Sequence, residues 1–219
     1  MRSLTAGLMA LALMVCPAVA ETPRQITWDD LVPAGPMLLD PSTPLNNSQR
    51  ADLYKVESIR EREKRGSISK ISPEYDDAVV LTRKLKKQGL DVDALLAALA
   101  EFDAEIVRRN QAVVGALEGQ LIRMPGYALP LEFSGGEMKE FLLVPFIGAC
   151  IHVPPPPPNQ VVFVKLNEGF TAKDLYTPVW ITGRMTINRA SKSLSLVDGQ
   201  SDVEMAYSIE GIRVELYKR

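Results

Sequence analysis

Cys150 and His152 are two positions apart in the stretch FIGACIHVPPPPPNQVVFV, and their side chains are those best suited to chemistry. His152 is the only histidine of the chain, and Cys16 is the only other cysteine. In an extended segment the two side chains point to one face, with Cα atoms about 6.5 to 7 Å apart. A thiolate and an imidazole placed in this way can bind one zinc or copper ion. The spacing therefore predicts a metal site at Cys150 and His152.

The proline run that follows His152 would hold this pair in place. Pro154 favours an extended conformation for the residue before it, and a polyproline rod is stiff without internal hydrogen bonds. Two ligands are too few for a tight zinc site, which needs three or four. Carboxylates, water or a second copy of the chain must supply the rest. The nearest acids in the sequence are Glu132, Glu137 and Glu140, and we expect Glu132 to be a ligand.

Other interpretations of this stretch stay open. Cys150 can be a buried, inert side chain, in which case the protein is a structural or assembly module. Cys150 can also be a nucleophile activated by His152. However, the sequence shows no signature of a group that orients the imidazole or of an oxyanion hole, so we expect no catalytic residues and no enzyme. The five prolines fit a rigid connector or a protected edge better than a ligand for a partner's aromatic groove.

Residues 1–20 predict a cleaved signal peptide. Arg2 provides a positive start, LTAGLMALALMV is an apolar core, and AVA before Glu21 is a cleavage site. We therefore expect a periplasmic protein. Lipidation at Cys16 is disfavoured because a proline follows it, and no later apolar run reaches the roughly 18 residues of a membrane span. A mature chain with one cysteine cannot form an internal disulfide.

The charge of the chain excludes one class of partner. The sequence has 25 basic and 27 acidic residues, with a net charge of −2. It has no excess of basic residues to neutralise phosphates. We expect no nucleic-acid partner, and the oligomeric state is not determined by the sequence.

Helix signals fill residues 48–110. Ser72 is an expected N-cap with Pro73 at the first helical position. Gly89 ends this helix, and Asp91 caps the next one. The order of helix, glycine turn and helix predicts an antiparallel hairpin of these two helices.

The flanking regions have different patterns. Residues 21–47 are polar and rich in proline, which predicts an extended arm without regular structure. Residues 111–219 contain short β-rich runs, and the segment VWITGRMTINR alternates with period two. Five or six strands of this length favour a small closed barrel over an open sheet. We therefore predict an α+β fold, with the helical region preceding a barrel that resembles an oligonucleotide/oligosaccharide-binding fold.

Three stretches carry a family resemblance: GQLIRMPGYALPLEF, EFLLVPFIGACIHVPPPPPNQVVFV and PVWITGRM. They resemble the bacterial family catalogued as domain of unknown function 3299, from about residue 115 to residue 217, and TWDDLVP near the N-terminus is also similar. The resemblance implies an exported protein. It also implies relatives encoded near transporters for metal uptake or lipoprotein-type export, which hints at metal handling.

Together these observations predict a non-catalytic periplasmic accessory protein. It would bind a transition metal, zinc or copper, or a protein partner such as an envelope transporter or a metal-binding protein. The competing hypothesis is a structural or assembly module with a buried Cys150.

Overall fold

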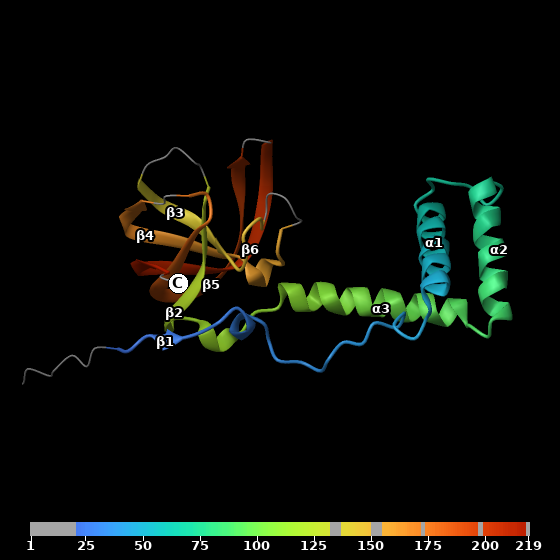
Figure 1. Ribbon diagram of the computed structural model, residues 1–219, viewed down its shortest axis with the longest axis horizontal. Helices are drawn as coiled ribbons and strands as arrows, with labels where there is room; N and C mark the ends of the chain where they lie inside the picture. Colours follow the sequence, from blue (N-terminus) through green and yellow to red (C-terminus); the bar gives the residue numbers. More distant parts are fainter. Residues whose placement is uncertain (1–20, 132–136, 150–154, 172–173, 197–198, 218–219) are drawn as a thin grey trace, which may run out of the picture.

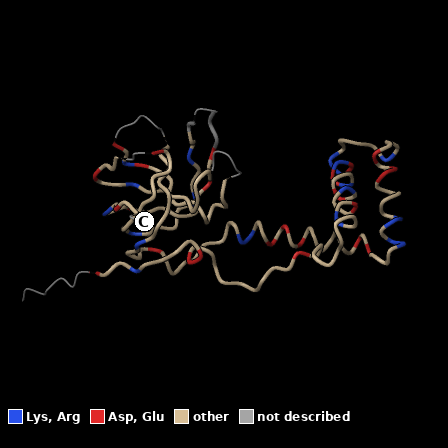
Figure 2. The backbone as a smooth tube through the Cα atoms, viewed as in Figure 1, with Lys and Arg blue, Asp and Glu red and all other residues tan. Residues whose placement is uncertain are grey.

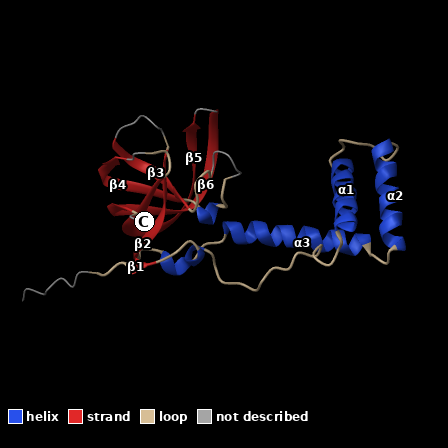
Figure 3. Cartoon of the chain, viewed as in Figure 1, coloured by secondary structure: helices blue, strands red, loops and turns tan. Residues whose placement is uncertain are grey.

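The structure, a computed structural model, describes residues 21–131, 137–149, 155–171, 174–196 and 199–217. The molecule is elongated, with the strands gathered at one end and a pair of helices at the other (Figure 1). A third helix and the N-terminal arm run between the two ends, so the chain connects them twice. Figure 3 shows this separation of strands and helices directly.

The helices begin where side chains cap them. They are α1 (Asn47–Lys64), α2 (Pro73–Lys87) and α3 (Val92–Gln111). The predicted N-caps Ser72 and Asp91 are confirmed, because each side chain accepts a hydrogen bond from a backbone N–H of the first turn. Asn46 and Gln49 form a reciprocal capping box at the start of α1. Among the described residues, no helix combines the length and apolar character needed to cross a membrane.

The antiparallel helix pair is α1 with α2, and the predicted pairing of the second and third helices is wrong. Ion pairs join α1 to α2, with Lys55 Nζ 3.0 Å from Asp77 and Lys84 Nζ 2.6 Å from Asp52. Instead of folding back along α2, α3 runs crosswise towards the strands (Figure 1). Its 20 residues span about 30 Å. The shared core of the three helices contains Leu45, Leu53, Val56, Leu85, Val92 and Leu99. The apolar face of α1 is buried against α2. Only the first turns of α3 are therefore needed to complete this core.

Six strands form the sheet at the other end. They are β1 (Arg24–Gln25), β2 (Leu121–Pro130), β3 (Glu137–Val144), β4 (Val162–Thr171), β5 (Thr177–Leu196) and β6 (Gly199–Leu216). The pairings β2–β3–β4–β6–β5 return to β2 and close a ring, which we call the strand ring. All its pairs are antiparallel except β4 with β6. The α+β class is therefore confirmed.

The N-terminal arm contributes to this end of the molecule. β1 pairs in parallel with β2, and a short 3-10 helix follows at Asp29–Leu31. Ile26 and Leu31 are buried in the core of the strand ring. The segment expected to lack regular structure thus holds two short elements that pack against the strands.

β3 is buried on both faces at its C-terminal half. Phe141 and Leu143 belong to the cluster inside the strand ring, together with side chains from the other four strands. Leu142 and Val144 point the other way, as the period of two requires. They belong to a second cluster with Leu194, Val203 and Met205 from the long β5–β6 hairpin. The hairpin therefore extends beyond the strand ring and covers it from outside.

Candidate functional site

None of the three residues expected to bind metal is among those that the structure describes. Cys150, His152 and Glu132 lie outside the described residues. Glu137 and Glu140 lie on β3, where Glu140 forms an ion pair of 3.5 Å with a lysine of β4. Across the residues that the structure describes, no group of three or more His, Cys, Asp or Glu side chains is arranged to hold a metal ion.

A cleft lies where the proline run re-enters the described structure at Pro155. It consists of two adjoining hollows of about 380 and 480 Å³ that share Pro158, Ser191 and Glu204. We call it the proline cleft. It is lined by Gln111, residues 155–158, residues 189–191, Asp202 and residues 204–206.

The β5–β6 hairpin places the polar side chains of this cleft. Ser191 is paired with Glu204 across the two strands, and the next pair on the same face is Ser193 with Asp202. Because side chains alternate along a strand, Asp202 and Glu204 share one face. Both carboxylates lie on exposed residues.

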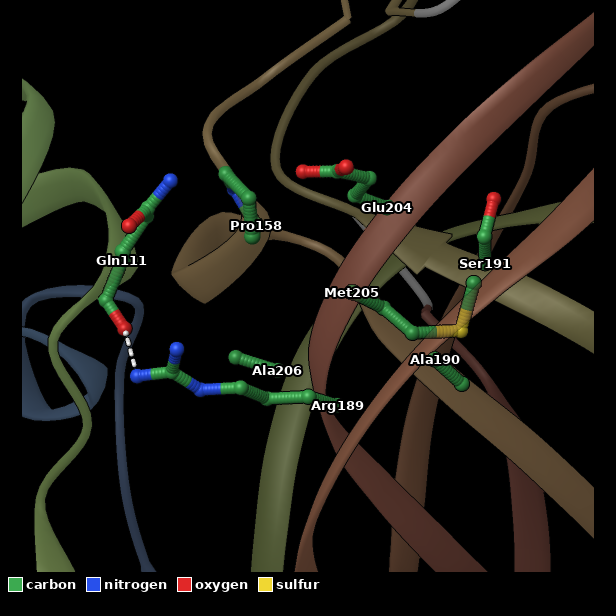
Figure 4. A pocket seen from close by; sticks show the side chains of 8 residues that line it. All are labelled: Gln111, Pro158, Arg189, Ala190, Ser191, Glu204, Met205 and Ala206. Carbon is green, nitrogen blue, oxygen red and sulfur yellow. Dashed lines mark hydrogen bonds between the residues drawn. The ribbon is translucent and has the colours of Figure 1, made fainter.

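Arg189 forms the other charged part of the cleft. Its Nη2 donates a hydrogen bond of 2.9 Å to the carbonyl oxygen of Gln111 at the end of α3. In Figure 4, the side chain of Arg189 points towards Gln111. Pro158 lies between Gln111 and Glu204 in this view. One guanidinium and the two carboxylates leave the lining with an excess of negative charge. Carboxylate oxygens suit a cationic ligand and can complete the coordination of a metal ion.

Asn159 and Gln160, which follow the prolines, fix the walls of the cleft. Asn159 is 1% exposed, and its Nδ2 donates to the carbonyl oxygens of Arg109 at 2.6 Å and Ala112 at 3.0 Å. Gln160 Nε2 donates to the carbonyl oxygen of Trp28 at 3.0 Å. The two amides therefore tie the end of α3 and the N-terminal arm to the strand ring.

Tyr207 makes a similar connection from β6. Its hydroxyl accepts a hydrogen bond from the backbone N–H of Val114 at 2.7 Å and donates one to the carbonyl oxygen of Leu31 at 2.8 Å. Burial raises the pKa of Tyr207, although the hydrogen bond from Val114 opposes this shift. The neutral phenol thus holds the linker after α3 and the arm in a fixed position.

Sequence reasoning missed Asp202, Glu204 and Arg189 as neighbours of the proline run. They are more than thirty positions away from it in the chain. The alternation in DVEMAY predicts that Asp202 and Glu204 share a face, but it does not indicate which segment lies opposite. Nothing in the sequence predicts the structural roles of Asn159 and Gln160, except that these residues follow the prolines.

The chain belongs to the family of unknown function that its sequence resembles. The family model described as Protein of unknown function (DUF3299) matches residues 28–216, which include the helical region. A crystal structure of a DUF3299 family protein from Pseudomonas aeruginosa PAO1 is similar, with 27% identity and a TM-score of 0.47. The alignment covers 91% of this chain and 99% of that one. Among curated proteins, none matches the chain.

Proposed function

We propose that the protein is a non-catalytic accessory of the periplasm that binds zinc or copper through Cys150 and His152 and serves envelope transport. The signal-peptide pattern of residues 1–20 supports the compartment. The thiolate and imidazole are the ligand types that borderline and soft metal ions prefer.

One observation of the structure supports the metal site most directly. Pro155 lines the proline cleft together with Asp202 and Glu204, and it follows His152 by three positions. Three residues span at most about 11 Å. We therefore propose Asp202 and Glu204, in addition to Glu132, as sources of the oxygen ligands that a Cys-x-His pair lacks.

We also propose that the strand ring is a small barrel that resembles an oligonucleotide/oligosaccharide-binding fold. The closed pairing of five strands and the parallel contact of β4 with β6 support this assignment. The negative charge of the proline cleft and of the whole chain argues against a nucleic-acid ligand.

A structural module with a buried Cys150 is the second candidate. Ala149, the residue before Cys150, is fully buried in the cluster under the β5–β6 hairpin. Its carbonyl oxygen accepts a hydrogen bond of 2.6 Å from the hydroxyl of Tyr176. A segment anchored in this way can serve packing alone.

Native mass spectrometry and calorimetric zinc and copper titrations of the mature protein separate the two candidates. A metal site predicts one bound ion per chain that a chelator removes. Cys150→Ser and His152→Ala should each abolish uptake, and Glu204→Gln should weaken it. Binding should also weaken below about pH 6, where the imidazole takes a proton.

Glu168→Gln is the matched control, because Glu168 is an exposed carboxylate on β4 away from the proline cleft. It should leave uptake unchanged. If the wild type takes up no metal while Cys150→Ser lowers the melting temperature by several degrees, the metal proposal is wrong and Cys150 belongs to the packing of the second cluster.

A further inference from the structure

A separate hollow, of about 300 Å³, lies over β2 and β5, beside the ends of β3 and β6 and the N-terminal arm. Four aromatic side chains line it: Trp28, Tyr127, Trp180 and Tyr217. The rest of the lining is Pro125, Gly126, Pro145 and Pro178. We call it the aromatic pocket. Its lining shares no residue with the proline cleft.

The aromatic pocket is preformed. The rings of Trp180 and Tyr217 are stacked, with centroids 5.8 Å apart and planes at 19°. The guanidinium of Arg123 lies 4.2 Å from the centre of the Trp180 ring, and the Tyr217 backbone N–H donates to the carbonyl oxygen of Pro178 at 3.0 Å. Rings held in this way lose little conformational entropy when a ligand binds.

Each polar side-chain group of the lining can donate a hydrogen bond. The indole N–H of Trp28 and Trp180 and the phenol groups of Tyr127 and Tyr217 have no hydrogen-bond partner among the described residues. The lining has no carboxylate, amide or cationic side chain. A suitable ligand therefore presents apolar rings together with free acceptors. An extended proline-rich segment does both, since its carbonyl groups make no internal hydrogen bonds.

Arg123 and Arg213 place positive charge beside the aromatic pocket, on the side of β2 and β6. Glu215 pairs with both Arg123 at 3.4 Å and Arg213 at 3.1 Å, which leaves one excess cation at the rim. Acidic residues beside the prolines of the ligand would match this rim.

We propose that the aromatic pocket docks an extended, acidic, proline-rich segment of a partner protein. This inference goes beyond metal binding and uses none of the residues assigned to it. The proline run of this chain is not the occupant, because Pro156 is buried in its own fold. A saccharide is the competing occupant, since its apolar faces also stack on aromatic rings.

Tryptophan emission provides a direct test, because the two tryptophans of the chain both line the aromatic pocket. The mature protein is titrated with the peptide acetyl-Pro-Pro-Glu-Pro-Pro-Asp-Pro-amide, and we expect a saturable change in emission. Alanine in place of each proline should weaken binding at least about tenfold. Lysine in place of both acids should weaken it as well. Chitotriose serves as the saccharide probe.

Variants locate the binding and check the fold. Tyr217→Ala should weaken the peptide at least about tenfold and lower the melting temperature only slightly, because it removes one stacked ring that is 45% exposed. Arg213→Glu should reverse the preference from the acidic to the lysine peptide. Ile71→Ala, an exposed apolar residue near α2 that is 93% accessible, should change nothing.

Several outcomes would overturn the proposal. One is a tryptophan emission that does not change when the proline peptide is added. Another is an alanine peptide that binds as tightly as the proline peptide. Saturation by chitotriose alone would assign a saccharide instead. Cys150→Ser should keep full peptide binding and Tyr217→Ala should keep full metal uptake, so either proposal can fail without the other.

Discussion

The buried amide of Asn159 donates a hydrogen bond to the carbonyl oxygen of Arg109, 2.6 Å away and fifty positions earlier in the chain. This contact joins the end of the proline run to the end of α3. The last carbonyl groups of a helix lack partners from a following turn. The side chain of Asn159 donates to two carbonyl oxygens of this region, those of Arg109 and Ala112. The segment of residues 155–160 is therefore a joint between the strand ring and the helix that projects from it.

Replacing Asn159 by alanine should destabilise the strand ring. The change removes the side-chain donor from the partly buried carbonyl oxygens of Arg109 and Ala112, of which only that of Arg109 keeps a bond from a backbone N–H, and we expect a cost of about 1–3 kcal/mol. Urea unfolding followed by tryptophan emission measures this loss, because both tryptophans pack at the strand ring. Asn167→Ala, an exposed asparagine of β4, should change the free energy of unfolding little. Equal effects of the two changes would contradict the proposed joint.

Replacing Tyr207 by phenylalanine keeps the ring but removes the hydroxyl that joins Val114 to Leu31. We expect a loss of about 1–3 kcal/mol in the free energy of unfolding at neutral pH. Tyr54→Phe should cost less, because Tyr54 is 41% exposed and its hydroxyl makes a single bond, of 3.0 Å, to Ser42.

The contribution of Tyr207 to the free energy of unfolding should depend on pH, and the Tyr207→Phe variant tests this. Burial raises the pKa of Tyr207 in the folded state, so the unfolded chain loses the phenol proton first. The contribution of Tyr207 is thus fully present below pH about 10 and is lost as the pH rises from there. The stability difference between wild type and Tyr207→Phe should shrink in alkaline urea titrations. A difference that grows above this pH would refute the assigned direction.

Gly183 should tolerate no side chain. It lies at a bulge where β5 pairs with β6, and an added Cβ would collide with the backbone oxygen of Glu210 and lie 2.8 Å from Cα of Gly211. Backbone atoms of a paired strand cannot move aside cheaply, so Gly183→Ala should cost at least about 3 kcal/mol or prevent folding. Gly115→Ala is the control, because nothing lies within 4 Å of its added Cβ. Thermal denaturation of both variants checks the contrast.

Asp93 should stabilise the helical region at neutral pH, and its contribution should be smaller in acid. Hydrogen bonds from Arg60 at 2.7 Å and Lys86 at 3.1 Å lower its pKa. The stabilisation is therefore present above the unfolded pKa near 4 and is lost as the pH falls below it. The pair is exposed, so Asp93→Asn should cost less than about 1 kcal/mol. It should reduce the acid sensitivity of the helical circular dichroism signal.

Glu101→Gln is the control for this change, since Glu101 is an exposed carboxylate of the same helix with no ion pair among the described residues. It should leave the acid transition in place. High salt should reduce the effect of Asp93→Asn, because the charges are accessible to ions. Figure 2 shows charged residues of both signs along α1 and α2.

The local signals of the sequence were sufficient for the individual elements. Ser72 and Asp91 start helices because their side chains bond to backbone groups only three positions away. The alternation around Trp180 predicts a strand because it depends only on the pleat. The family resemblance was also carried by contiguous stretches, and the family model confirms it.

The partners of these elements were decided only in the tertiary structure. An apolar face on a helix predicts that this face is buried, but it does not indicate which element covers it. The sequence pattern therefore could not distinguish the pairing of α1 with α2 from the pairing of α2 with α3. The pairing of β2 with β5 and the meeting of the proline run with Asp202 and Glu204 join residues more than forty positions apart. Such contacts depend on how the whole chain closes on itself, and no local pattern in the sequence encodes that.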